Sequence, residues 1–215
     1  MNHISESIEY EIPYEKVMYF KGIIKNHKEI IDLIENINSY AVSHWETWIA
    51  QDSGHHYGEV KFLRKELLKK ETDAVIKEKS IFLIDSLINS MVKSAEIYEK
   101  QYDIGQDNLK FLIEYLNRDV AKYGVNKYYE NSFMGPHTDW NEVNSDLLFT
   151  IVIYLNDEYD DGELYFNNFE LKIKPKAGSV IIFPSALPYL HQSLKITKGR
   201  KMLITHHWKK IQPID

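Results

Sequence analysis

Two histidines and an aspartate have the types and the spacing to bind one metal ion. His137 and Asp139 are separated by a single residue, so in an extended segment their side chains point to the same side. His191 comes much later in the chain, directly after a predicted strand. Two imidazoles and one carboxylate on one side of a metal leave its opposite side open to other ligands. We therefore take these three residues as candidate metal ligands.

This ligand set is that of the facial triad of non-haem Fe(II) oxygenases. Their chemistry needs two open coordination places for a bidentate 2-oxo acid and a third for O₂. The chain has nine histidines and no cysteine, which excludes disulfides, thiolate zinc sites, iron–sulfur clusters and cysteine nucleophiles. The H-x-D spacing alone is a weak signal, because a chain with this many histidines and aspartates contains one by chance about as often as not.

Length, composition and charge are those of one globular unit. The 215 residues, 44% hydrophobic and 27% charged, can bury a core without disulfides, and we expect a single domain over residues 1–215. No apolar stretch is long enough to span a membrane, and the net charge of −6 argues against a nucleic-acid partner. Residues 1–10 lack the features of a secretory signal, so we expect a cytoplasmic protein. The oligomeric state is left open.

The elements that must position the candidate ligands differ between the two halves of the chain. Residues 1–119 are predicted to form a mostly helical N-terminal layer. Apolar residues recur at helical spacing over residues 28–37 and 80–98, and a third helix is expected over residues 109–117 with Asn108 as its N-cap. The segment 60–68 fits both a helix and a loop.

Residues 120–210 are rich in β-branched and aromatic residues and are interrupted by turn residues. The predicted strands cover residues 122–130, 147–155, 163–166, 170–173, 180–183 and 202–208. Short strands at this spacing are typical of an antiparallel sandwich or jelly roll. The fold class is therefore α+β, with N-terminal helices packed on a β-sandwich.

The stretch from Tyr128 to Trp208 resembles the 2-oxoglutarate/Fe(II) dioxygenases, in particular their prolyl 4-hydroxylase-like branch. After H-T-D at residue 137 come TIVIYLN at 150, DGELYF at 161, KPKAGSVIIF at 174 and HQSLKITKGRK at 191. The chain departs from the family pattern at Asp161, which replaces the first glycine of G-G-E, and at Ser193, which replaces a valine. Its closing tryptophan falls one residue late.

The resemblance implies a double-stranded β-helix (jelly-roll, cupin-like) core and Fe(II) bound by His137, Asp139 and His191. It implies 2-oxoglutarate and O₂ as co-substrates, with ascorbate as a further candidate cofactor. The reaction would hydroxylate a peptide, protein or small-molecule substrate and release succinate and CO₂, as in enzymes that act on peptidyl or free proline. An aspartate at position 139 fills the place that halogenases leave for chloride, which favours hydroxylation.

Two adjacent cations compete for the distal carboxylate of 2-oxoglutarate. Arg200 and Lys201 face opposite ways on a strand, so only one of them can point inward. The placement of Lys201, ten residues after His191, is similar to the prolyl 4-hydroxylase arrangement, whereas some relatives place an arginine at the position of Arg200. Register with Thr205, which matches an inward family position, favours Lys201. His207 shares that face and is expected inside the barrel but outside the ligand set.

Two tyrosines complete the implied co-substrate site. Tyr128 matches a family tyrosine near 2-oxoglutarate, and Tyr154 matches a position that hydrogen-bonds the distal carboxylate. Two other functions fit the strand pattern: a non-catalytic jelly-roll binding module, and a cupin-like metalloenzyme that uses no 2-oxo acid. The cation in Gly199-x-Lys201 argues against both.

Overall fold

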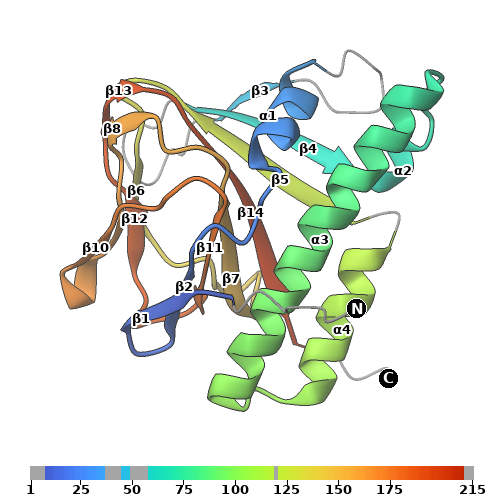
Figure 1. Cartoon of the computed structure of the whole chain (residues 1–215). Coiled ribbons are helices and arrows are strands. Elements are labelled where there is room, and N and C mark those ends of the chain that lie inside the picture. Colours follow the sequence, from blue (N-terminus) through green and yellow to red (C-terminus); the bar gives the residue numbers. More distant parts are fainter. Residues whose placement is uncertain (1–7, 37–44, 49–57, 119–120, 211–215) are drawn as a thin grey trace.

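The protein is built from two opposed β-sheets with helices on the outer side of the larger sheet (Figure 1). The structure is a computed structural model that describes residues 8–36, 45–48, 58–118 and 121–210. His55 and His56, for which the polar, glycine-containing sequence predicts a loop, fall outside these residues.

The larger sheet has eight strands in the order β1-β2-β11-β7-β14-β5-β4-β3, and every neighbouring pair is antiparallel. In that order the strands are β1 (Tyr10–Tyr14), β2 (Val17–Phe20), β11 (Ser179–Pro184), β7 (Leu147–Tyr154), β14 (Lys201–Lys209), β5 (Lys122–Tyr128), β4 (Gly58–Arg64) and β3 (Glu46–Trp48).

The smaller sheet has four strands in the order β10-β9-β12-β6. They are β10 (Leu171–Ile173), β9 (Leu164–Phe166), β12 (His191–Ser193) and β6 (Met134–His137), with a 3₁₀ turn η1 (Asn167–Phe169) and a separate pair β8 (Tyr159–Asp161) and β13 (Ile196–Gly199). Tyr154 and Phe183 of the larger sheet pack with Phe166 of the smaller sheet in one buried cluster. The two sheets therefore form the predicted sandwich.

A second buried cluster lies between the larger sheet and the helices α1 (His27–Asn36), α2 (Lys65–Leu68), α3 (Ala74–Tyr102) and α4 (Gln106–Asn117). Ile151 and Ile153 of β7 face this cluster, whereas Val152 and Tyr154 face the other sheet. Both faces of β7 are thus buried, which explains its continuous apolar run. Figure 1 shows α3 and α4 side by side over the sheet.

The helical periodicity of the N-terminal half did not predict β1 to β4, which all precede residue 119 and all join the larger sheet. All four residues of β2 are buried, and so short an apolar run carries no period that separates a strand from a helix. Segment 60–68 contains most of β4 followed by α2. The helix α4 begins at Gln106, and its N-cap is Gly105 rather than Asn108.

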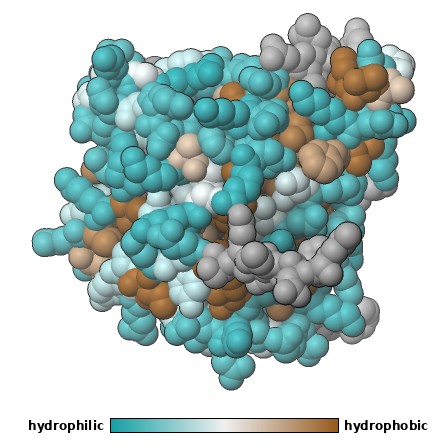
Figure 2. Space-filling view, in the orientation of Figure 1, coloured by the Kyte–Doolittle hydropathy of each residue, from teal (hydrophilic) through white to brown (hydrophobic). Residues whose placement is uncertain are grey.

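The surface on the side of Figure 2 is largely hydrophilic, with apolar atoms gathered at the upper right over α2 and the start of α3. Val75, Ile76 and Phe82 are the exposed apolar side chains of that end of α3. None of the helices that the structure describes is long and apolar enough to cross a membrane.

Candidate metal centre and co-substrate pocket

The three predicted metal ligands come together between β6, β12 and the segment that follows β6. His137 ends β6, His191 begins β12, and the two residues are register partners in the smaller sheet. One ligand atom from each of His137, Asp139 and His191 lies within 4.8 Å of the other two. Among the residues that the structure describes, this is the one such group of three, and one metal ion could bridge it.

Both imidazoles are oriented by backbone carbonyls. The Nδ1 of His137 lies 2.9 Å from the carbonyl oxygen of Gly135, and the Nδ1 of His191 lies 3.1 Å from that of Tyr189. Each contact places the ring proton on Nδ1 and leaves Nε2 free for a metal. Burial lowers the pKa of His191 to about 4, so its ring is neutral at pH 7, the form that coordinates a metal.

The carboxylate of Asp139 is held from both sides. Its Oδ2 accepts a hydrogen bond of 2.5 Å from Thr150 Oγ1, which also contacts Ser185 Oγ at 2.9 Å. Its Oδ1 lies 3.5 Å from His207 Nε2. Burial acts to raise the pKa of Asp139, but the contact with His207 and the neighbouring His191 outweigh it and hold the pKa below its usual value. The carboxylate is therefore ionised and fixed in place.

Sequence reasoning missed Thr150 and Ser185 as partners of this carboxylate. Thr150, Val152 and Tyr154 are two residues apart along β7. The period of a strand therefore places the side chain of Thr150 on the same inner face as theirs. No comparable signal marks Ser185, which follows the last residue of β11. His207 is the register partner of Thr150 on β14 and lines the cavity as predicted, outside the three-ligand group.

Lys201 points into the sandwich. Its side chain is 1% exposed, its Nζ donates a hydrogen bond of 2.9 Å to the carbonyl oxygen of Gly162 and another to Ser193 Oγ, and it lies 4.7 Å from the centre of the Tyr128 ring. Burial, with a smaller effect from the like charge of Lys174, lowers the pKa of Lys201 to about 7. Among the described residues it forms no ion pair with a carboxylate. A buried ammonium without a counter-charge is a candidate anion site.

Arg200 faces the other way, as alternation along a strand requires. Its guanidinium pairs with Glu35 at 3.0 Å, and 43% of its side chain is exposed. The structure thus places Lys201, and not Arg200, on the inner face of β14.

Tyr128, Tyr154 and Thr205 line the same cavity of about 970 Å³ as the three candidate ligands. Burial raises the pKa of both tyrosines, so their hydroxyls are protonated at neutral pH. Thr205 Oγ1 accepts a hydrogen bond from Asn126 Nδ2 at 3.2 Å. Lys201 lies behind Ser193, which lines the cavity. The structure therefore brings together all the predicted site residues except Arg200.

Comparison with known proteins agrees with this arrangement. Residues 123–209 match the 2OG-Fe(II) oxygenase superfamily. A protein of Acanthamoeba polyphaga mimivirus described as a candidate prolyl 4-hydroxylase is 32% identical over 132 residues, which cover 54% of this chain and 51% of the relative. The chain thus spans about half the length of that relative. A PKHD-type hydroxylase of Prochlorococcus marinus strain MIT 9215 is 29% identical over 192 residues, or 86% of this chain and 75% of that protein.

A solved structure shares the fold. The prolyl hydroxylase of Trichoplax adhaerens, in complex with a peptide fragment of the hypoxia inducible factor oxygen degradation domain, superposes with a TM-score of 0.61 at 14% identity over 92% of this chain and 85% of that chain. The predicted double-stranded β-helix is confirmed. Two imidazoles and a carboxylate fit Fe(II), and a buried ammonium beside them fits 2-oxoglutarate. The residues that hold these groups lie in the segment 123–209 that matches the 2OG-Fe(II) oxygenase superfamily.

Proposed function

We propose that the protein is an Fe(II)- and 2-oxoglutarate-dependent hydroxylase. The observation that carries the proposal is one cavity lined by two oriented histidines and an ionised aspartate, with a buried lysine directly behind Ser193 of its wall that forms no ion pair with a described carboxylate. 2-Oxoglutarate has a carboxylate at each end, so its recognition calls for a metal site and a cation in the same pocket. A jelly-roll binding module without catalysis needs neither.

Different residues of the chain would bind the metal and the co-substrate. His137, Asp139 and His191 would hold the metal, while Thr150 keeps the aspartate from rotating. Lys201 would exchange its hydrogen bonds to Gly162 and Ser193 for the distal carboxylate of 2-oxoglutarate.

When bound, Fe(II) and 2-oxoglutarate supply the oxidising chemistry, in which O₂ is consumed, succinate and CO₂ are released and a substrate C–H bond becomes C–OH. The apolar side chains of Val152, Leu164 and Leu203 also line the cavity. They exclude water from the space beside the candidate ligands, which strengthens the electrostatic contacts there.

The substrate is proposed to be a proline residue in a peptide, or free proline. Support comes from the resemblance to prolyl 4-hydroxylases and from the names of the mimivirus and Trichoplax proteins. The test is succinate formation with proline-containing peptides and with free proline, measured against the same protein without substrate.

The co-substrate assignment is tested first by an anaerobic thermal melt of the full chain in four conditions: apo, with Mn(II), with 2-oxoglutarate, and with both. At a 100-fold excess over Kd a ligand adds about 2.7 kcal/mol to the free energy of unfolding, which for a chain of this size shifts Tm by about 5–10 °C. A 2-oxoglutarate shift that requires the metal supports the proposal. A metal shift alone indicates a metalloenzyme that uses no 2-oxo acid, and no shift indicates a binding module.

Substitutions at two neighbouring residues test which cation binds the distal carboxylate of 2-oxoglutarate. Lys201→Met should abolish the 2-oxoglutarate shift and keep the Mn(II) shift, because the lost group binds only the co-substrate. Arg200→Met removes the same charge on the opposite face of β14 and should keep both shifts. If Arg200→Met abolishes the 2-oxoglutarate shift instead, the assignment of Lys201 is wrong.

A further inference from the structure

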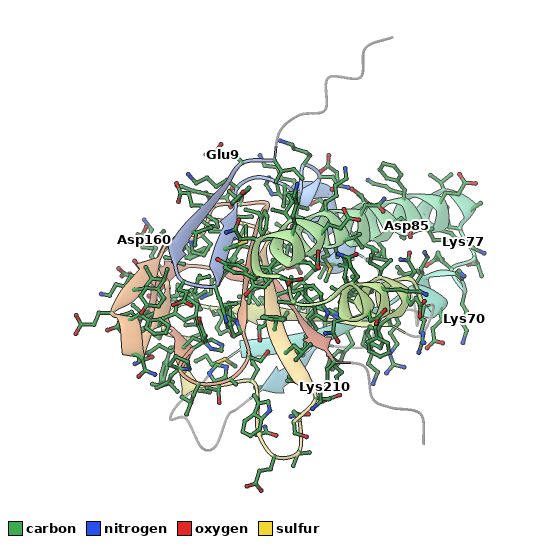
Figure 3. All side chains as sticks on the ribbon, turned by 90° about the horizontal axis from the view of Figure 1, so that it is seen from below. Glu9, Lys70, Lys77, Asp85, Asp160 and Lys210 are labelled. Carbon is green, nitrogen blue, oxygen red and sulfur yellow. The ribbon has the colours of Figure 1, made fainter. Side chains whose placement is uncertain are left out.

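The wall of the cavity carries a charge opposite to that of the chain. The chain has a net charge of −6, yet Arg118, Lys122 and Lys209 line the cavity and Asp139 is the only described carboxylate that does so. In Figure 3 the labelled acidic residues Glu9 and Asp160 lie at the outer edge of the molecule. Since Asp139 belongs to the candidate metal centre, the lysine and arginine side chains are the charged groups that remain on the rest of the described wall.

Lys209 is already neutralised, because its Nζ pairs with Asp146 at 3.0 Å. Arg118 and Lys122 are exposed, and neither forms an ion pair with a carboxylate of the described residues. As far as the described part of the chain extends, two cations at the cavity wall are therefore available to a ligand.

Lys122 lies on the inner face of β5, at the opposite end from Tyr128. Alternation along the strand puts Tyr128, Asn126, Gly124 and Lys122 on one face, and all four line the cavity. The Nζ of Lys122 lies 5.9 Å from the centre of the Phe62 ring. Phe62 of β4 is the register partner of Gly124 and is 37% exposed.

Gly124 leaves room above this floor. A Cβ atom at Gly124 would lie 3.7 Å from both Phe62 Cε1 and the carbonyl oxygen of Thr205, so any larger side chain would project over the ring. We name the surface formed by Phe62, Lys122, Gly124 and Asn126 the β4–β5 shelf. It has an aromatic floor, an amide on one side and a cation at its end.

2-Oxoglutarate cannot account for the cation of the shelf. Lys201 is the register partner of Tyr128, and Lys122 lies six residues from Tyr128 along β5, which is about 20 Å. A five-carbon acid that binds the candidate metal centre and Lys201 does not reach Lys122. The positive charge at that end of the cavity is thus free for a second anion.

We propose that the β4–β5 shelf binds the substrate and that the substrate carries a carboxylate near the group that is hydroxylated, as an acidic peptide does. This inference rests on the proposed hydroxylase function and adds the charge of its substrate. The apolar part of the substrate packs on Phe62, and its carboxylate pairs with Lys122 and Arg118.

The test is equilibrium binding of blocked peptides to the full chain loaded with Mn(II) and 2-oxoglutarate without O₂. One series has proline flanked by glutamate, glutamine or lysine, and a second series has alanine in place of proline. Each exposed ion pair contributes up to about 1 kcal/mol, or about fivefold in Kd, so the glutamate peptide should bind about fivefold more tightly than the glutamine peptide. The preference should shrink as NaCl is added.

Charge reversal locates the effect. Lys122→Glu should reverse the preference, so that the lysine peptide binds more tightly than the glutamate peptide. Lys110→Glu, an equal change at an exposed residue of α4 that does not line the cavity, should leave the preference unchanged. The thermal shifts with Mn(II) and 2-oxoglutarate should be the same in both variants and in the parent.

Equal binding of the three peptides, a preference for lysine in the parent, or no binding by any peptide overturns the inference. A preference that Lys110→Glu also reverses overturns it as well, because the charge then acts through the whole surface. Failure of the hydroxylase proposal looks different, since it shows as loss of the metal-dependent 2-oxoglutarate shift before any peptide is added.

Discussion

Raising the pH from 7 to 8.5 is expected to weaken 2-oxoglutarate binding about 16-fold. Burial lowers the pKa of Lys201 to about 7, whereas both carboxylates of 2-oxoglutarate are ionised throughout this range. The ammonium form binds the distal carboxylate, and that form makes up about half of the free protein at pH 7 and about 3% at pH 8.5. The bound carboxylate raises the pKa of Lys201, so binding takes up a proton.

The lowered pKa of Lys201 also determines how the stability of the ligand-free protein changes with pH. An unfolded lysine has a pKa near 10.5, so between pH 7 and about 10.5 the unfolded chain binds more protons than the folded one. The contribution of Lys201 to the free energy of unfolding therefore rises with pH across this window. Ligand affinity and the stability of the free protein should change in opposite directions.

Isothermal titration calorimetry of the Mn(II)-loaded protein without O₂, in two buffers of different ionisation enthalpy, measures the proton uptake. We expect about 0.5 protons at pH 7 and about 0.9 at pH 8. His191 does not contribute, because its pKa of about 4 keeps it neutral in this range. Lys174 is the nearest competing group, and Lys174→Gln separates its effect. No proton uptake in the parent, or uptake that persists in Lys201→Arg, refutes the reasoning.

Three further perturbations test other parts of the structure. Thr150→Val removes the hydrogen bond to Asp139 and should weaken Mn(II) binding about tenfold; unchanged affinity in a metal titration contradicts the positioning role. Leu87→Ala opens a cavity under α3 and should lower the free energy of unfolding by about 3 kcal/mol and Tm by about 6–12 °C, whereas Leu187→Ala, at an exposed site, should change neither. Gly178→Ala should destabilise the fold by more than about 1 kcal/mol in a denaturant titration, because its φ is +73° and a Cβ would lie 2.5 Å from a backbone carbonyl oxygen.

The C-terminal strands β7 and β11 could be predicted because two physical signals agree there, whereas the short strands β6, β8, β12 and β13 were not predicted. β7 and β11 are apolar on both faces, since each is buried between the other sheet and the helices, and turn residues separate them from their neighbours. The candidate metal ligands could be identified for a related reason. The pairing of His137 with His191 in the smaller sheet sets Asp139 near both, so the H-x-D spacing carries three-dimensional information.

Among the N-terminal strands, β4 was not predicted because its charged side chains interrupt the apolar pattern that would indicate a buried strand. Lys61 is 5% exposed, and its Nζ donates to the carbonyl oxygen of Ile34 at 2.9 Å. A lysine that covers apolar surface with its stem and places its head on a carbonyl looks in sequence like a solvated cation. Lys65, which pairs with Asp85, likewise belongs to a separate contact.

The position of β4 explains how this half of the chain affects function. The buried cluster between the two sheets includes Tyr128 of β5 and no described residue of β4, so the inner face of β4 is left to the cavity. Lys127 of β5 ties this edge to α1 through Glu35 at 3.1 Å and to β4 through Glu59 at 3.7 Å. Half of the β4–β5 shelf thus comes from outside the segment 123–209 that carries the candidate metal ligands. Changes in β4 can therefore alter what binds next to the candidate metal centre while leaving that centre intact.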